Sequence, residues 1–397
     1  MPHPGSTAIP ALALLLATAV TSPAVVLAQA AKPAAPAAPV LSFEEVARRA
    51  KEARETNRAE EAIALYKKGV RLRPRWDEGW WYLGTLLYEK DRFEAARDAF
   101  RRMLAVKADV GAAWALRGLC DFRVADYPAA LEHITKGLQL GLGDNRELTS
   151  VVRYHQGLLQ VKGGQFELAL ESLTLLARTG QETPGLTDAI GLMLLRKALV
   201  PSEIPEADRD LVRQAGHAGY LSLARQGDAA ALAFAALVAA YPSTPYVHYA
   251  AGAFLLQSDA DRGLAELRRE VQIFPDNVFA HLEIAFELLR RADHEGAKAA
   301  AEQAVRIAPG LFAAHNALGR ALVDAGDLER GLKELEEAVR LAPEAPEMYF
   351  SLARAYQKAG RTEDAARARA QFAEMDKKRR ELRGQAPQGR DQANPPL

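Results

Sequence analysis

Cysteine is almost absent from this chain of 397 residues, and Cys120 is its only example. A single thiol excludes an intramolecular disulfide and a cysteine metal cluster, so packing alone must hold the fold. Net charge is absent too, because the chain has 51 Lys and Arg residues and 51 Asp and Glu residues. We therefore expect no long-range field that would attract nucleic acid, an anionic membrane or an acidic substrate.

Recognisable catalytic motifs are missing as well. The sequence has no H-E-x-x-H zinc motif, no glycine-rich phosphate loop and no G-x-S-x-G nucleophile turn. His281 and His315 lie 34 residues apart, with His248 nearby, so a metal-binding ladder of imidazoles is one interpretation. Neither a carboxylate nor a thiolate recurs beside them as metal ligation requires, which favours histidines that replace packing aromatics. We predict no enzyme activity, no cofactor and no metal.

The N-terminus has the pattern of a targeting segment. Residues 1–31 contain no Asp, Glu, Lys or Arg, and the run from Ala8 to Ala28 is rich in Ala, Leu and Val. An apolar run with a small-residue site is typical of a secretory signal peptide, here residues 1–28, so we expect export to the periplasm or beyond. An uncleaved membrane anchor is the alternative, since the run nearly reaches spanning length. Residues 29–41, rich in Ala and Pro, are expected to form an extended linker.

An internal repeat runs through most of the remaining chain. Pro275, Pro309 and Pro343 are each 34 residues apart, and similar segments precede them, as in GAKAAAEQAVRIAP and GLKELEEAVRLAP. Each of these follows another amphipathic segment, as in HNALGRALVDAGDLERG, whose apolar residues recur at helical spacing until a Gly or Asp interrupts them. Each unit is therefore predicted to be a helix, a tight turn and a helix. Because one hairpin cannot bury both of its faces, neighbouring units must stack into a solenoid.

This pattern resembles that of tetratricopeptide repeat proteins. Trp80, Leu83, Gly84, Ala96 and Phe100 match the family's spacing, although Leu87 and Ala108 depart from it. Later units match it through His315, Leu318, Gly319, Leu322, Gly331, Leu335, Ala338 and Pro343, and through Tyr349, Leu352, Ala353, Tyr356 and Ala365. The resemblance implies an all-α, right-handed superhelical solenoid of about nine helix-turn-helix repeats. The units are placed at 43–76, 77–110, 111–144, 150–182, 211–243, 244–277, 278–311, 312–345 and 346–383.

These units form two predicted blocks, one of about four repeats at 42–182 and one of about five repeats with a C-terminal capping helix at 211–383. Residues 183–210 contain one apolar helix and then VPSEIPEAD with two prolines. They are predicted to be either a degenerate repeat or a joint between two rigid halves. The tail at 384–397 has no apolar period and is expected to be disordered. The basic run Lys377–Arg380 is expected to be a solvated face, with contact to anionic lipid as the alternative.

The predicted binding surface is the one lined by the first helix of each repeat, which is the concave side in solenoids of this kind. Trp80, Leu83, Gly84 and Leu87 share one packing stripe, and the neighbouring stripe lies about 100° around the helix. Applied along the chain, this offset selects aromatic residues that we expect to line a groove: Trp81, Tyr82, Tyr88, Phe122, Tyr154, Tyr249, Phe279 and Phe286. Large rings anchor a partner at low entropic cost. Packing between superhelical turns is the alternative role for these rings.

We therefore expect a non-catalytic scaffold that binds a protein or peptide, and no nucleic acid, in the cell envelope. The alternative is a structural or oligomerising component that uses its convex face or its ends. Membrane contact is expected only through the N-terminal segment or Lys377–Arg380. The family's arrangement for gripping a C-terminal carboxylate uses Lys, Asn and Arg at matched places, and here only scattered residues of these types occur: Lys51, Asn316, Arg320 and Arg354. We do not expect that function.

Overall fold

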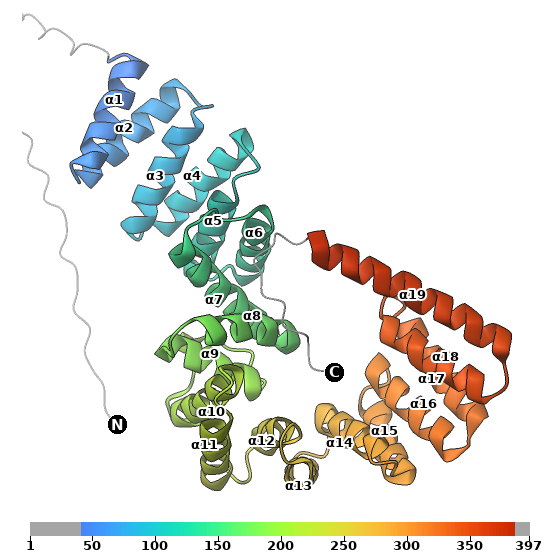
Figure 1. Cartoon of the computed structure of the whole chain (residues 1–397). Coiled ribbons are helices and arrows are strands. Elements are labelled where there is room, and N and C mark those ends of the chain that lie inside the picture. The colour runs from blue at the N-terminus through green and yellow to red at the C-terminus, as the bar shows by residue number, and fades with distance from the viewer. Residues whose placement is uncertain (1–40, 386–397) are drawn as a thin grey trace, which may run out of the picture. The chain divides into compact units, whose positions relative to one another are not determined.

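The computed structural model describes residues 41–385 of the chain. Within this range the chain forms 19 α-helices, two short 3-10 helices and no strand, so the predicted all-α class is confirmed (Figure 1). The predicted signal segment, most of the linker and nearly all of the tail lie outside the described residues.

The first eight helices are α1 (Phe43–Glu55), α2 (Ala59–Leu72), α3 (Asp77–Glu89), α4 (Phe93–Val106), α5 (Gly111–Arg123), α6 (Tyr127–Leu140), α7 (Arg146–Lys162) and α8 (Phe166–Thr179). The middle of the chain holds α9 (Pro184–Leu194), η1 (Pro201–Glu203) and η2 (Glu206–Asp208). The last ten helices are α10 (Arg209–Leu223), α11 (Gly227–Ala240), α12 (Val247–Leu255), α13 (Ala260–Ile273), α14 (Val278–Arg290), α15 (His294–Ile307), α16 (Phe312–Ala325), α17 (Leu328–Leu341), α18 (Pro346–Lys358) and α19 (Thr362–Gln385).

Consecutive helices pair across tight turns, with four pairs from α1 to α8 and five from α10 to α19. Nine pairs agree with the solenoid of about nine repeats that the sequence predicts. First helices of successive pairs also touch each other, as α14 touches α16 and α16 touches α18. We call the surface formed by α1, α3, α5, α7, α10, α12, α14, α16 and α18 the first-helix face. The second helices of the pairs form the second-helix face.

Some predicted boundaries differ from the observed ones by a few residues. α7 begins at Arg146 rather than near residue 150, and α10 begins at Arg209 rather than at 211. Asn145 explains the early start of α7, because its side-chain oxygen accepts a hydrogen bond from the backbone N–H of Leu148. At the other end, α19 continues to Gln385, slightly beyond the predicted end at Arg383.

A residue in the left-handed conformation marks the turn inside most pairs, and it recurs at the spacing of the repeat. The turns of three N-terminal pairs use Asn57, Asp91 and Ala125, and those of three C-terminal pairs use Ala292, Gly326 and Gly360. Glycine adopts positive φ without steric cost, and Asn and Asp tolerate it better than other residues. Ala125, with φ of 61°, shows that the two packed helices fix the turn even where the residue disfavours it.

The packing stripe predicted around Trp80 is confirmed. Trp80, Leu83 and Leu87 are all buried, and Leu87 is only 1% exposed. Gly84 completes the stripe because a Cβ atom there would lie 2.7 Å from the ring of Phe100 on α4. The absence of a side chain thus lets the two helices of this pair approach each other closely.

A ring N–H donated to a backbone carbonyl recurs at the boundaries between repeats. In five repeats the aromatic or histidine near the start of the first helix donates to the carbonyl six residues earlier, in the loop that precedes the helix. The pairs are Trp80 to Pro74 at 2.8 Å, Trp114 to Ala108 at 2.8 Å, His248 to Pro242 at 3.0 Å, His281 to Pro275 at 2.9 Å, and His315 to Pro309 at 2.9 Å. A carbonyl only accepts, so each of these histidines carries a proton on Nε2. Histidine therefore replaces tryptophan here by keeping its hydrogen bond, as well as by filling its place.

The segment predicted as a degenerate repeat or joint contains a deeply buried helix. In α9, Ala189, Ile190 and Leu192 have no exposed surface, and a continuous core runs from Leu158 to Ala251 around them. Residues 195–208, where the second helix of a repeat would otherwise lie, contain only the short helices η1 and η2. α9 packs directly against α10 instead.

Two glycines bring the backbones of α9 and α10 together. A Cβ atom on Gly191 would lie 2.0 Å from the carbonyl oxygen of Val212, and one on Gly216 would lie 1.9 Å from that of Thr187. These distances are far below van der Waals contact, and the opposing atoms belong to backbone, which cannot rotate away. The contact between these helices therefore requires glycine on both sides.

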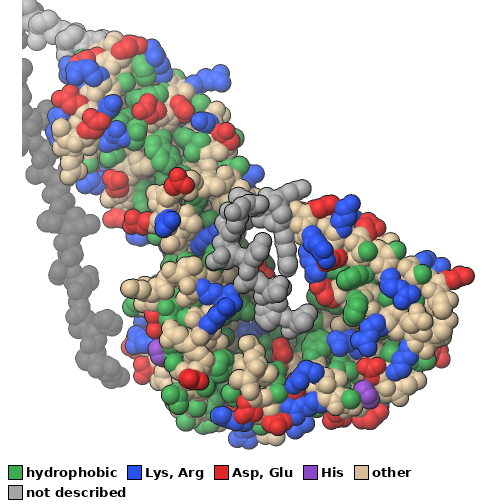
Figure 2. All heavy atoms as spheres, viewed as in Figure 1, with side chains coloured by type: hydrophobic (Ala, Val, Ile, Leu, Met, Phe, Trp, Pro, Cys, Tyr) green, Lys and Arg blue, Asp and Glu red, His purple; other side chains and the backbone are tan. Residues whose placement is uncertain are grey.

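On the face seen in Figure 2, charges of both signs are interspersed rather than gathered by sign. The basic run on α19 is an example, because every one of its side chains pairs with a carboxylate. The pairs are Lys377 with Glu381 at 3.8 Å, Lys378 with Glu374 at 2.9 Å, Arg379 with Asp376 at 2.8 Å and Arg380 with Asp376 at 2.6 Å. Among the helices of residues 41–385, none has the length and hydropathy that a membrane span requires.

The glycine contact predicts a localised loss of stability. Gly216→Ala should lower the free energy of unfolding by about 1–3 kcal/mol, because the added methyl group forces α9 and α10 apart. Gly227→Ala is the matched control, since a Cβ atom at Gly227 would meet nothing within 4 Å. That control should be neutral or slightly stabilising. Urea unfolding followed by circular dichroism measures both variants, and equal stability of the two would contradict the close approach.

The buried imidazole of His281 predicts a pH dependence of stability. Burial lowers the pKa of His281 below its ordinary value of 6.5, although its hydrogen bond to Pro275 opposes the shift. Below that value the unfolded chain binds more protons than the folded chain, so stability falls as pH decreases from about 7.5 to about 5.5. His281→Gln keeps an N–H donor that does not titrate and should show a smaller fall. Urea midpoints at both pH values test this, and an identical fall in the two proteins would refute it.

Candidate functional site

The eight aromatics predicted to line a groove all lie on first helices or directly at their ends, and all are half-buried. None of them stands free in solvent, because each packs against a neighbouring ring, cation or apolar core. Their roles therefore combine packing between repeats with a partly exposed edge on the first-helix face.

Trp81 and Tyr82 face different neighbours although they are adjacent in sequence. The ring of Trp81 lies 5.9 Å from that of Phe100, in the second helix of its own pair. The ring of Tyr82 lies 5.7 Å from that of Tyr66 and under the guanidinium of Arg54, 3.5 Å from its centre, so it joins α3 to the preceding pair. Trp81 also lines a shallow depression at the boundary with the following pair.

Phe122 and Tyr154 are linked by a histidine that the sequence did not single out. The ring of His155 on α7 lies 4.8 Å from that of Phe122 on α5 and 5.1 Å from that of Tyr154. Burial raises the pKa of Tyr154 to about 12 and lowers the pKa of His155. Tyr88, which contacts the ring of Phe93 at 5.5 Å, also has a pKa raised by burial. Phe122, His155 and Tyr154 thus form a packed row from α5 to α7, and Tyr88 packs separately against Phe93 of α4.

Tyr249 and Phe279 are held by an arginine that the sequence pattern did not reveal. The guanidinium of Arg196, just after α9, lies 3.5 Å from the ring centre of Phe279 and pairs with Glu167 on α8 at 2.7 Å. Tyr249 lies 6.4 Å from Phe279, and burial raises its pKa to about 12. Burial also raises the pKa of nearby Glu283. Arg196 thus bridges α8 and α14, two helices far apart in the sequence.

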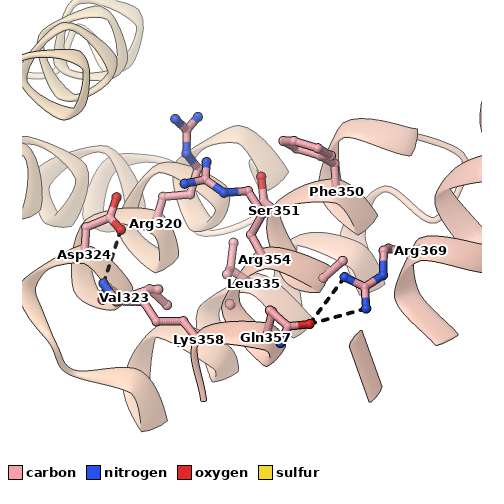
Figure 3. Close-up of a pocket in the computed structure, with 12 residues that line it drawn as sticks. Arg320, Val323, Asp324, Leu335, Phe350, Ser351, Arg354, Gln357, Lys358 and Arg369 are labelled. Atoms are coloured by element: carbon pink, nitrogen blue, oxygen red, sulfur yellow. Dashed lines mark hydrogen bonds and ion pairs between the residues drawn. The ribbon is translucent and has the colours of Figure 1, made fainter. Parts of the chain in front are cut away.

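Phe286 lies beside a residue of a basic cavity at the C-terminal end of the first-helix face. The guanidinium of Arg320 lies 5.8 Å from the ring centre of Phe286. Arg320 on α16 and Arg354 on α18 both line a cavity of about 420 Å³. The other side chains around it include Val323, Asp324, Leu335, Phe350, Ser351, Gln357, Lys358 and Arg369 (Figure 3). The cavity therefore contains four cationic side chains and one acidic side chain.

The two inner arginines of this cavity have no carboxylate partner among the described residues. Burial lowers the pKa of Arg320, and the positive charge on Arg354 lowers it further, although the carboxylate of Asp324 opposes the shift. Lys358 is already engaged, because it donates to the carbonyl of Val323 at 2.7 Å and pairs with Asp324 at 3.5 Å. Figure 3 shows Arg320 and Arg354 projecting toward the same space.

The spacing of three residues in the sequence is a signal for this cavity that aromatic patterning alone does not reveal. Phe286, Arg320 and Arg354 are separated by 34 residues each, so they occupy the same place in three consecutive repeats. Equal places in stacked repeats lie side by side. Lys51, named above together with Arg320, lies instead on α1 and pairs with Glu55. Asn316 is buried on α16 and does not line the cavity.

The histidine ladder is used for structure. The expectation that no carboxylate lies beside these histidines is wrong for two of them. His248 Nδ1 lies 2.5 Å from Glu266, and His315 Nδ1 lies 2.6 Å from Glu334, both on the second helix of the same repeat. These carboxylates are distant in sequence, so local spacing does not show them. With Nε2 bound to a carbonyl and Nδ1 to a carboxylate, neither ring has a free nitrogen, and residues 41–385 contain no group of three potential ligands that would hold a metal.

A buried polar cluster surrounds Asp121 on α5. Its carboxylate lies 2.6 Å from Nδ1 of His133 and 3.5 Å from the guanidinium of Arg97. The adjacent thiol of Cys120 is fully buried, and burial raises its pKa to about 12. The thiolate, which is the nucleophilic form, is therefore scarce near neutral pH. We assign this cluster to packing between α4, α5 and α6.

A family model supports the repeat assignment for two segments of the chain. The tetratricopeptide repeat family model matches residues 48–113 and 316–375. No curated protein matches the chain. Among solved structures, MamA residues 41 to the end from Desulfovibrio magneticus RS-1 is 19% identical with a TM-score of 0.40, covering 42% of this chain and 96% of that one. The Cut9-Hcn1 hetero-tetramer of the APC/C is 12% identical with a TM-score of 0.36, covering 84% of this chain and 66% of the matched chain.

The family matches fall on α1 to α5 and on α16 to α19, at opposite ends of the same series of helix pairs. Between them, the pairs keep the ring hydrogen bond at the repeat boundary, at His248 and at His281. The chain thus contains tetratricopeptide repeats toward both ends of this series of helix pairs, at residues 48–113 and 316–375.

Proposed function

We propose that this protein is a non-catalytic scaffold that binds a protein segment along its first-helix face. Proteins built from tetratricopeptide repeats bind protein partners, and this supports the general role. The observation that carries the proposal is the row of Phe286, Arg320 and Arg354 on three adjacent first helices. An aromatic ring and two cations without carboxylate partners suit the binding of a polypeptide better than they suit packing.

We further propose that the protein acts after export, in the cell envelope. The support is in the sequence, where residues 1–31 lack Asp, Glu, Lys and Arg and include a long apolar run. An uncleaved anchor in the same segment is the alternative, and it would place the repeats at a membrane surface.

A second candidate function is assembly through the second-helix face, and a feature of α11 favours it. Leu232 on this helix is 75% exposed, which is the largest exposure among the large apolar side chains of the described residues. Asp228 is the only charged residue in α11, whereas the other second helices carry more charge. An exposed apolar helix of this kind is typical of contacts between protein subunits.

Site-specific photo-crosslinking tests which face binds the partner. The full chain would carry p-benzoylphenylalanine in place of Phe350, which is 52% exposed on α18, or in place of Leu232 as the matched position on the second-helix face. We expect a defined adduct with a different protein from position 350 and none from position 232, because the first-helix face holds the unpaired groups. Mass spectrometry of the recovered chain also reports whether residues 1–28 have been removed.

The outcomes separate the candidates. Adducts from position 232 alone, or adducts of this chain with itself, would favour assembly and count against the scaffold. No specific adduct from position 350 in any fraction would refute binding at this end of the first-helix face.

A further inference from the structure

The basic cavity between α16, α18 and α19 contains arginine side chains that no acidic side chain of the cavity neutralises. Arg320 and Arg354 occupy equivalent places in successive repeats, and their side chains enter the cavity from neighbouring helices (Figure 3). Neither forms an ion pair within residues 41–385. Arg320 is half-buried and Arg354 is exposed. A half-buried guanidinium without a partner is unfavourable, and a bound anion would relieve this cost for Arg320.

The two remaining cationic side chains of the cavity, Lys358 and Arg369, differ in the hydrogen-bond and ion-pair partners that they already have. Asp324 and the carbonyl of Val323 already hold the ammonium group of Lys358. Arg369 on α19 reaches only an amide, with its two terminal nitrogens each 3.4 Å from Oε1 of Gln357. Three guanidinium groups from three helices are thus available to an incoming anion. Because these guanidinium groups come from three different helices, they suit a polypeptide with several carboxylates better than a ligand with a single carboxylate.

The cavity also has an apolar side. Phe350 is 52% exposed, and its ring contacts that of Phe372 at 5.8 Å. Leu335 and Val323 line the cavity more deeply and are buried. An exposed aromatic ring beside arginines offers a place for an apolar side chain next to a carboxylate. The combination suits a ligand with both a carboxylate and an apolar group better than an inorganic ion.

We propose that this cavity binds an internal acidic segment of the partner protein, with a Glu or Asp carboxylate between Arg320 and Arg354 and a neighbouring apolar side chain against Phe350. This inference rests on the proposed function, since it names the chemistry of the segment that the first-helix face binds. Guanidinium groups suit this role because they hold carboxylates through paired, charge-assisted hydrogen bonds.

Fluorescence anisotropy with the full chain tests the proposal directly. The probe is a fluorescein-labelled peptide with both ends blocked and a Glu-Glu-Phe-Glu core, compared with the same peptide carrying Gln in place of each Glu. A third peptide has the Gln core and a free C-terminal carboxylate. We expect the blocked Glu peptide to bind, with an affinity that falls as salt rises, and the other two to bind at least about tenfold more weakly.

Matched double variants locate the binding. Arg320→Gln with Arg354→Gln should weaken binding of the Glu peptide by roughly tenfold or more, because two charge-assisted contacts are lost. Arg178→Gln with Arg268→Gln removes the same charge from exposed second-helix positions that form no ion pair in the described residues, and should leave binding within about twofold. Arg320→Lys with Arg354→Lys keeps the charge but not the paired geometry, and should give an intermediate loss. Circular dichroism checks that each variant is folded. Phe350→Ala removes the exposed ring against which the apolar side chain of the peptide would pack, so it should also weaken binding of the Glu peptide.

Several results would overturn the proposal. Equal losses in the two Gln pairs would indicate general charge attraction, and preference for the free C-terminal carboxylate would indicate a different ligand. Failure of the Glu peptide to bind, together with a protein adduct from position 350, would remove the acidic segment but leave the scaffold function standing. Failure of both would remove both.

Discussion

The hydrogen bond from a ring N–H to the carbonyl six residues earlier is the interaction on which the rest of this solenoid depends. It closes the boundary between one helix pair and the next, and it recurs with tryptophan at Trp80 and Trp114 and with histidine at three later positions. A repeat contacts only its neighbours, so the order of the whole stack is the sum of such boundaries. The interior of each pair follows from packing of apolar stripes. The boundary in addition gives a carbonyl acceptor to a ring N–H on a largely buried side chain, which would be costly to leave unpaired.

Regular boundaries have a functional consequence, because they place equivalent residues of successive repeats beside one another. The row of Phe286, Arg320 and Arg354 exists only because three first helices stack in register. The same regularity fails at α9, where close glycine contacts and the bridge from Arg196 to Glu167 and Phe279 replace the repeat's own packing. The irregular part of the molecule is therefore held by contacts that the repeat does not supply, and the regular part places equivalent side chains next to one another.

Much of the fold was predictable from the sequence, because the repeat fixes the helices, the turns and the stripe around Trp80. The aromatic residues were harder, since the offset that selected Trp81 and Tyr82 says where a side chain leaves its own helix and nothing about the neighbouring repeat it meets. The roles of Arg196 and Glu266 were not predictable from local spacing, because their partners are distant in sequence. Arg320 and Arg354 could have been identified from the sequence, since their spacing equals the period of the repeat. A search limited to aromatic residues does not include them.

The claim that ring hydrogen bonds hold the repeat boundaries is tested most directly by comparing Trp80→Phe with Trp81→Phe in urea unfolding. Both variants shorten an indole to a phenyl ring on the same helix, but only Trp80 donates its Nε1–H to a backbone carbonyl. Trp80→Phe should lower the free energy of unfolding by about 0.5–1.5 kcal/mol more than Trp81→Phe, because it removes the hydrogen bond to the carbonyl of Pro74. Equal losses in the two variants would show that ring burial alone accounts for the boundary, and would contradict a stabilising role for the hydrogen bond.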